Sequence, residues 1–320
     1  MNRRDFLKRS ALTAGLALTQ PWNLVRNGLY APAPAYAAHP KRIFNGWQHT
    51  GMPDFETLYG WRYLLFRHWQ TYTGQAALWS DNLSLPAAGW YDILAANYTH
   101  PDKMLIFDHE AWPAPTGSSA QDIADRQESA EKFVTLYNGI KAVMPDYKIA
   151  FYVYPMNRDF FRARTGPGDP DYIAWQAIND DYAALWAKVD FVVPSIYFFY
   201  TRDQGIPGAG ENVADAHEYF YENITECRRC TQVHGTNQPI YPYVWNRRQD
   251  DATVLDMDVW IDMCRTAYLE ADGLVTFGGF STTWDNDAPW FLNFKAKFPF
   301  GDRTIVKPLS AISQPRLPRN

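Results

Sequence analysis

The amino-acid sequence predicts an α/β fold, a single (β/α) TIM-like barrel with about seven to eight parallel strands. Short apolar runs alternate with longer amphipathic runs along most of the chain, and this alternation requires parallel strands joined by helical crossovers. No repeat or low-complexity linker divides the 320 residues, a length at which barrels fold as one domain. Polar and aromatic residues follow several apolar runs, where the loops of a barrel build its active site.

The elements follow in the order that such a barrel needs. Strands are expected at 42–48, 63–69, 104–108, 148–154, 190–199, 240–245 and 273–277, with Pro194 inside the fifth of them. Helices are expected at 120–144, 171–188, 213–233, 256–270 and 286–297. We expect the catalytic barrel to span 38–304 and the Pro-rich stretch 305–320 to be an extended tail.

Residues 1–37 are expected to be a twin-arginine signal peptide. The segment from Asn2 to Lys8 resembles the twin-arginine motif, and Ala35-Tyr36-Ala37 is a small-residue cleavage site. The apolar stretch between them is too short for a spanning helix. We therefore expect an exported bacterial protein, periplasmic or extracellular, that meets the twin-arginine export machinery and has no stable membrane insertion.

The charge and composition of the mature chain limit the kinds of partner that it can bind. Residues 1–37 carry five basic residues against one acidic residue, so their removal lowers the formal net charge from −5 to −9. A chain this acidic is not expected to bind nucleic acid in general. Aromatic residues make up 16% of the chain, enough to fill a core or to line a groove where sugars stack.

The stretch from Met104 to Glu110 is the most informative one. An apolar run, typical of a strand buried on both faces, ends in Asp108 and Glu110. Side chains alternate along a strand, so both acids point the same way, roughly 6–7 Å apart along the chain. Because two neighbouring carboxyls cannot both ionise cheaply, one pKa should rise and supply a general acid at neutral pH. The alternative is an Asp that caps a turn beside a solvated Glu.

Neither a metal nor a cofactor is expected. His109 lies between the two acids, so it should face the opposite side as a packed or hydrogen-bonded residue, and no His-x-His accompanies it. The sequence has no Gly-rich phosphate loop and no Gly-x-Ser-x-Gly elbow. Cys227, Cys230 and Cys264 cannot form a disulfide framework, although the first two could pair.

Five short motifs follow one another between Asp108 and Trp284. They are Asp-x-Glu-x-Trp, Tyr-Pro, Pro-Ser-Ile-Tyr, Pro-Tyr-Val and Gly-Leu-Val with a later Trp. In this order they resemble the hyaluronidase family of glycoside hydrolases, of which the chain would be a divergent bacterial member. The resemblance implies that Glu110 is the proton donor. It also implies that Asp108 holds the 2-acetamido group of the substrate, which attacks the anomeric carbon in place of an enzyme nucleophile.

The same resemblance implies roles for residues at later strand ends. Tyr197 would steady the acetamido group, Tyr243 would contact the substrate, and Trp284 would wall the sugar subsite. Since Tyr241 has the same spacing to Pro242 as Tyr243, we expect only one of these two tyrosines to face inward. The substrate-binding residues predicted in full are Trp112, Tyr154, Tyr243, Arg247, Trp284 and Asp285.

The family usually has Arg-Pro after its Glu-x-Trp, whereas Pro113 follows Trp112 directly here. Although the mature chain is acidic, a cleft in it could still be basic and bind an acidic sugar. The arginines that could line such a cleft are Arg158, Arg162, Arg164, Arg247 and Arg248.

The sequence thus predicts a secreted glycoside hydrolase of carbohydrate metabolism that cleaves a polysaccharide, with Glu110 as general acid/base. Three alternatives stay open. The first is a conventional two-carboxylate glycosidase, with Asp285 or Asp159 completing the pair. The others are a non-catalytic carbohydrate-binding barrel and a metal-dependent hydrolase.

Overall fold

The computed structural model describes residues 39, 41–63, 66–68, 83–198, 213–249, 252–278 and 282–297. All of them belong to one compact unit, His39–Asn320. The expected signal peptide at 1–37 and the expected tail at 305–320 lie outside the described residues.

The described strands form two parallel sheets. They are β1 (Arg42–Asn45), β2 (Arg62–Tyr63), β3 (Phe66–His68), β4 (Met104–Asp108), β5 (Lys148–Phe151), β6 (Tyr243–Trp245) and β7 (Gly273–Phe277). One sheet has the order β2-β1-β7-β6 and the other the order β3-β4-β5, and every pairing between these strands is parallel. The prediction of an α/β fold with parallel strands is confirmed.

Residues 192–195 join the two sheets on one side. Val193 bridges to Tyr152 after β5, while Val192 bridges to Ile240 and Ser195 to Tyr243 of β6. Pro194 has no N–H to donate, and in place of the continuous strand expected at 190–199 there are single bridges. On the other side, residues 64–65 between β2 and β3 are not described, so the described pairings do not close a barrel.

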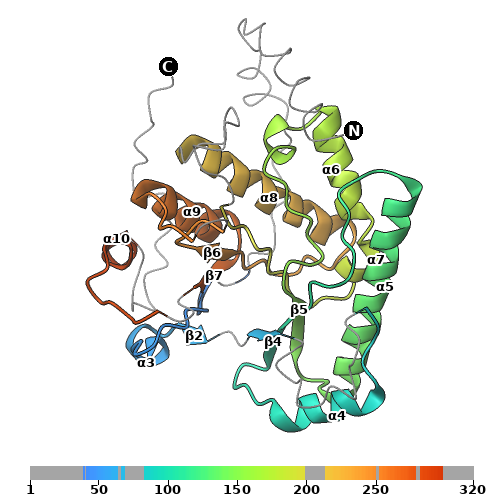
Figure 1. Ribbon diagram of the computed structural model, residues 1–320, viewed down its shortest axis with the longest axis horizontal. Coiled ribbons are helices and arrows are strands. Elements are labelled where there is room, and N and C mark those ends of the chain that lie inside the picture. Colours follow the sequence, from blue (N-terminus) through green and yellow to red (C-terminus); the bar gives the residue numbers. More distant parts are fainter. Residues whose placement is uncertain are drawn as a thin grey trace, which may run out of the picture. The chain divides into compact units, whose positions relative to one another are not determined.

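Helices separate most of the strands along the chain. They are α3 (Phe55–Tyr59), α4 (Ala88–Asn97), α5 (Ala120–Val143), α6 (Pro170–Asp180), α7 (Ala183–Trp186), α8 (Val213–Val233), α9 (Met257–Glu270) and α10 (Pro289–Lys297), with a 3₁₀ turn, η2 (Ala163–Thr165). α8 and α9 pack side by side (Figure 1). Among the described helices, none has both the length and the apolar character that a membrane span needs.

Two helices were not predicted, and one predicted helix is divided. α3 begins after Asp54, whose carboxylate accepts hydrogen bonds from two backbone N–H groups, and ends at Gly60 with φ of 69°. The helix expected at 171–188 is α6 followed by α7, with Asp181 and Tyr182 between them. This break places Tyr182 in the wall of a cavity described below.

Two buried clusters lie on opposite faces of the strands. The strand cluster contains only residues of strands and strand ends: Phe44, Met104, Ile106, Ala150, Tyr152, Phe191, Val193, Tyr197, Tyr241, Tyr243 and Val275. The helix cluster joins the other face to the helices and includes Leu105, Phe107 and Phe133 of α5. Along β4 the side chains alternate between the two clusters, so Asp108 follows Met104 and Ile106 toward the strand cluster.

Candidate active site

The two acids at the end of β4 form a coupled pair. The Asp108 side chain is buried, at 5% exposure, whereas Glu110 is exposed. Burial, then the negative charge of Glu110 and the hydrogen bond between the carboxyls, raise the pKa of Asp108 from 3.8 to about 8. The expected rise of one pKa in the pair is confirmed. It falls on Asp108, although the resemblance makes Glu110 the donor, so at neutral pH the two carboxyls share one proton.

Three tyrosines of the strand cluster gather beside this pair. The Tyr152 hydroxyl donates to Ser195 Oγ at 3.1 Å, and its ring lies 5.2 Å from that of Tyr243 and 6.4 Å from that of Tyr197. Burial raises the pKa of Tyr152 to about 12, and the charge of Glu110 adds to the rise, whereas the hydroxyls of Ser195 and Tyr197 oppose it. Burial also holds the pKa of Tyr197 well above its ordinary value. The Tyr152 and Tyr197 phenols therefore stay protonated and can donate hydrogen bonds at neutral pH.

Sequence reasoning missed Tyr152 and misplaced Tyr241. Tyr152 lies two residues after Ala150, on the same face of the strand, and this spacing was the available signal. Tyr241 and Tyr243 both lie in the strand cluster, so the expectation that only one faces inward is wrong, because residues two apart on a strand share a face. The Tyr241 ring packs 5.0 Å from that of Phe44.

The residues next to the pair face the helix cluster instead. His109 is fully buried, with its ring 4.2 Å from that of Trp112, which confirms that it faces away from the two acids. The structure does not bring Trp112 to the acids: the indole, at 1% exposure, packs 4.6 Å from Phe133. Tyr154 also lies in the helix cluster, and its hydroxyl donates to the Trp112 carbonyl at 2.9 Å. His109 and Trp112 support the strand end from behind, whereas Tyr154 also lines the cavity described below.

No described contact joins Arg247, Trp284 or Asp285 to the acids, and their roles in substrate binding stay predictions. The Trp284 ring packs 4.7 Å from Phe291 in a cluster of aromatic rings, and its Nε1 donates to Asn286 Oδ1 at 2.8 Å. Asp285 is exposed and accepts a hydrogen bond from the Asp287 backbone at 2.9 Å. Arg247 donates to the Ala252 carbonyl at 2.7 Å.

Both carboxylates considered for a conventional catalytic pair stabilise turns. Asp285 does so as just described. Asp159 accepts backbone hydrogen bonds from Phe161 at 2.8 Å and Arg162 at 2.6 Å, and its other oxygen pairs with Arg162 Nε at 2.9 Å. With its oxygens committed in this way, Asp159 is poorly placed to act as a nucleophile or base.

A cavity of about 210 Å³ opens next to the acids. It is lined by Ala114, Thr116, Val153, Tyr154, Met156, Asn157, Arg158 and Tyr182. Burial, and then the charge of Glu110, raise the pKa of the lining residue Tyr154, so Glu110 lies close to this wall. The positive charge of Arg158 lowers the pKa values of Tyr152 and Tyr197, so this cation lies close to these two tyrosines as well. Of the other arginines expected in a basic cleft, Arg162 pairs with Asp159.

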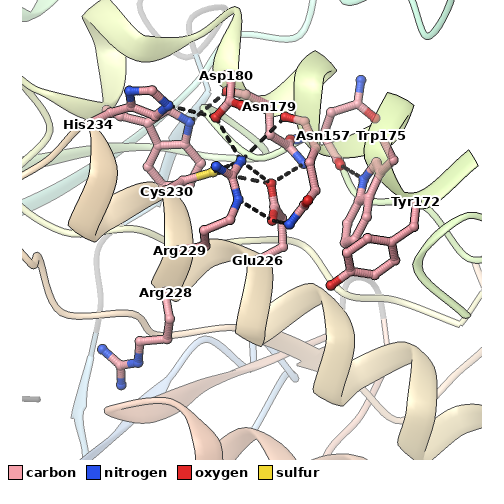
Figure 2. A network of polar contacts seen from close by, with 12 residues as sticks. Asn157, Tyr172, Trp175, Asn179, Asp180, Glu226, Arg228, Arg229, Cys230 and His234 are labelled. Carbon is pink, nitrogen blue, oxygen red and sulfur yellow. Dashed lines mark hydrogen bonds and ion pairs between the residues drawn. The ribbon is translucent and has the colours of Figure 1, made fainter. Parts of the chain in front are cut away.

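A buried polar network fixes the cavity wall at Asn157 (Figure 2). The Asn157 N–H donates to Asn179 Oδ1 at 2.8 Å, and its carbonyl accepts from Trp175 Nε1 at 2.7 Å, so α6 holds both backbone groups. Asn179 Nδ2 in turn donates to Glu226 Oε1 at 3.2 Å. Because Glu226 is at 0% exposure and accepts this bond, it orients the amide so that its oxygen faces Asn157.

The charge of Glu226 is balanced inside the same network. Arg229 Nη2 lies 2.7 Å from both Glu226 Oε1 and Asp180 Oδ1, and His234 Nε2 lies 2.6 Å from the same Asp180 oxygen. Because Glu226 is buried, loss of Arg229 would leave its charge uncompensated, so Glu226 depends on this partner. Cys230 donates its thiol to Glu226 at 3.3 Å. It is a free thiol like Cys227 and Cys264, so the two cysteines that could pair are not joined.

In the part of the chain that the structure describes, no group of three or more His, Cys, Asp or Glu side chains is arranged to hold a metal ion.

Comparisons with known proteins identify similar solved structures. No family model and no curated protein matches the chain. A monoclinic crystal structure of bee venom hyaluronidase has 18% sequence identity and a TM-score of 0.43, covering 64% of this chain and 72% of that chain. Bee venom hyaluronidase in complex with a hyaluronic acid tetramer has 19% identity and a TM-score of 0.43, covering 64% of this chain and 68% of that chain. The chain is thus structurally similar to bee venom hyaluronidase at low identity.

Proposed function

We propose that this protein is a glycoside hydrolase in which Glu110 protonates the glycosidic oxygen and Asp108 holds a 2-acetamido group of the substrate. The observation that carries the proposal is the coupled carboxyl pair after β4, one member buried and one exposed, beside the tyrosines of the strand cluster. An exposed acid next to a buried acid that stores a proton suits acid–base chemistry on a sugar. The order of the five sequence motifs supports a hyaluronidase-like version of this chemistry.

The shared proton gives the mechanism its first step. In the free protein Asp108 holds the proton in the neutral range. When the acetamido N–H of a bound sugar donates to Asp108, it favours the ionised form of this carboxyl. The proton then passes through the hydrogen bond to Glu110, which is exposed and can reach the glycosidic oxygen. Substrate binding thereby turns Glu110 into the acid.

The bond changes then balance without an enzyme nucleophile. The acetamido oxygen forms a bond to the anomeric carbon as the glycosidic C–O bond breaks, and the leaving oxygen takes the proton from Glu110. The ionised Glu110 next removes a proton from water, whose oxygen attacks the anomeric carbon and displaces the acetamido oxygen. Two displacements at one carbon retain its configuration. Tyr197 steadies the acetamido group in this scheme, because its protonated phenol is a donor next to Tyr152, which lies close to Glu110.

We infer two further properties that support this assignment. β2 pairs with β1, and β3 pairs with β4. Because β2 and β3 follow each other in the chain, these two strands are suited to close a barrel between β1 and β4. An experimental structure without pairing along 62–68 would contradict closure. The twin-arginine motif implies export, and the N-terminus of protein recovered outside the cytoplasm should then lie near Ala38.

Reducing-end release tests the function directly. We expect the wild type to release reducing ends from an acetamido-containing polysaccharide in a panel that includes hyaluronan and chondroitin, with retention at the anomeric carbon. Glu110→Gln and Asp108→Asn should each lose nearly all turnover and stay folded, whereas Glu131→Gln, a matched acid-to-amide change on the exposed face of α5, should retain it. Substantial turnover by Glu110→Gln would refute the proposal. Binding without turnover in the wild type would favour a non-catalytic sugar-binding protein.

A further inference from the structure

The segment 109–119, which joins β4 to α5 and carries Glu110, contains no helix or strand. Its backbone groups therefore need partners outside a regular ladder. The segment starts from Asp108, the last residue of β4, which pairs with β3. Two residues after Glu110, the Trp112 carbonyl accepts a hydrogen bond from the Tyr154 hydroxyl at 2.9 Å. Glu110 thus lies midway between two points at which the backbone is held.

The rest of the segment is held by one face of α5. Ser129 Oγ donates to the Pro113 carbonyl at 2.7 Å. Arg126 Nη1 donates to the carbonyls of Pro115 at 2.7 Å and Gly117 at 2.8 Å. Both donor residues are buried, at 1% exposure, so these hydrogen bonds are shielded from water.

The spacing of residues on α5 explains how one helix face holds a long stretch of loop. Arg126, Ser129 and Phe133 follow one another at intervals of three and four residues, so they lie on the same side of the helix. The Phe133 ring packs 4.6 Å from the Trp112 indole, whereas Arg126 reaches as far as Gly117. The helix and the segment therefore run in opposite directions, and the helix face fixes the shape of the segment.

Arg126 also connects the segment to the break between α6 and α7. Its Nε and Nη2 lie 2.8 Å and 2.6 Å from Asp181 Oδ2, so each guanidinium nitrogen has an acceptor. A buried ion pair contributes little net stability, because the cost of desolvation offsets the attraction. What an arginine supplies here is geometry, since its rigid planar fork sets the directions of several acceptors at once.

We propose that Arg126 and Ser129 are positioning residues for the general acid: they hold the segment that follows Glu110, and so keep its carboxyl next to Asp108 and within reach of the reacting bond. This inference rests on the proposed function. A general acid must lie within hydrogen-bond reach of the oxygen that it protonates, and a displacement of about 1 Å can lower the rate about a hundredfold. Because neither residue contacts the substrate in the scheme above, loosening the segment should lower kcat and leave KM nearly unchanged.

Two variants loosen the segment to different degrees. Ser129→Ala removes one donor and leaves the pair of Arg126 and Asp181 intact. We expect it to lower kcat about three- to tenfold, the range of one ordinary hydrogen bond, and to change KM by less than about twofold. Arg126→Lys keeps the positive charge, but one ammonium group cannot serve Asp181 and both carbonyls together. We expect kcat to fall about ten- to a hundredfold, again with KM nearly unchanged.

Tyr137→Phe is the matched control, because it also removes a hydrogen-bond donor of α5. The Tyr137 hydroxyl donates to Asp190 Oδ2 at 3.1 Å, and Asp190 lies outside the segment. This variant should keep the kcat and KM of the wild type even where it loses as much stability as Ser129→Ala. An unchanged kcat in Ser129→Ala, or an equal fall in Tyr137→Phe, would overturn the inference.

A readout on the acid pair itself needs no turnover. In protein with isotope-labelled Asp and Glu carboxyl carbons, the Asp108 resonance, assigned with Asp108→Asn, reports the ionisation of this carboxyl as the pH changes. Since the charge of Glu110 contributes to the raised pKa of Asp108, Ser129→Ala and Arg126→Lys should lower this pKa, and Tyr137→Phe should not. The same pKa in all of these proteins would refute the positioning role. Failure of the wild type to cleave any glycan of the panel would refute the proposed function instead, and the titration would still test the positioning.

Discussion

Replacing Asp108 with Asn should stabilise the folded protein relative to wild type, and the gain should grow as the pH rises from about 4 to about 8. The pKa of Asp108 is raised in the folded protein from 3.8 to about 8, chiefly by burial. Between these values the unfolded chain releases the proton and the folded chain keeps it. The unfolded state therefore binds fewer protons, and wild-type stability falls with rising pH. Asn carries no such proton, so the variant escapes this loss.

The size of the effect follows from one proton. A difference of one bound proton changes the free energy of unfolding by about 1.4 kcal/mol per pH unit, or about 2.7 kcal/mol between pH 5 and pH 7. This value is an upper bound, because Asp108 titrates together with Glu110. Taking the difference between variant and wild type at each pH cancels the contributions of the titrating groups that do not interact with Asp108.

Chemical denaturation at several pH values measures this difference, provided the m-value stays constant. Glu110→Gln is the informative control, since it removes the charge that is the second cause of the raised pKa. It should make the fall in stability with pH shallower without abolishing it. Asp285→Asn, at an exposed turn, should follow the wild type. If the Asp108→Asn difference were the same at pH 5 and pH 7, the carboxyl would ionise equally in both states, and the coupled pair would be refuted.

Three more predictions follow from the same contacts. The kcat/KM of the wild type should fall as the pH rises through about 8, because the acid pair then loses its proton, and a pH–rate profile flat to pH 9 would contradict this. Asn179→Asp and Glu226→Gln should each destabilise the protein by about 2–4 kcal/mol, whereas the double variant should recover about 1–3 kcal/mol of stability. In the double variant, the amide that replaces the Glu226 carboxylate can donate to the new carboxylate at 179, which still accepts the Asn157 N–H. A double-mutant cycle by denaturation measures this recovery, and additive losses would count against the network. Gly278→Ala should lower the free energy of unfolding by more than about 1 kcal/mol in the same assay, since φ is 124° at this position and the added Cβ would lie 2.7 Å from Trp245 Nε1. An unchanged stability would show that this indole can move.

The sequence was sufficient to predict the coupling of the two acids and insufficient to assign the proton. Alternation alone places Asp108 and Glu110 on one side of β4 and His109 on the other. The apolar run before them is buried on both faces, so nothing in it says which face meets the strand cluster. The proton lies on Asp108 because side chains distant in the sequence remove water from it, and these are visible only in the folded chain.

Local backbone geometry limited the prediction at Tyr152 and Tyr154. Regular alternation would put both tyrosines on one face. Val153 instead has φ of 71°, a conformation that β-branched residues seldom adopt, and the chain turns there so that Tyr154 joins the helix cluster. The sequence also did not show the backbone break at Tyr182, because the amphipathic pattern continues from α6 into α7. The signals for α3, a capping Asp54 and a terminal Gly60, were present and not used.

Unequal burial explains how two similar carboxyls can take different roles. A group that gives a proton to a substrate must be reachable, as Glu110 is, whereas a group that retains a proton at neutral pH must be kept from water, as Asp108 is. In the free protein the proton therefore lies on the carboxyl that cannot deliver it. Delivery of the proton requires a ligand that stabilises the ionised form of Asp108. An acetamido N–H can do this by donating a hydrogen bond to the carboxylate, whereas a sugar without a donor at this position cannot. Selectivity for acetamido sugars would then arise in the proton transfer itself, and affinity for other glycans would not make them substrates.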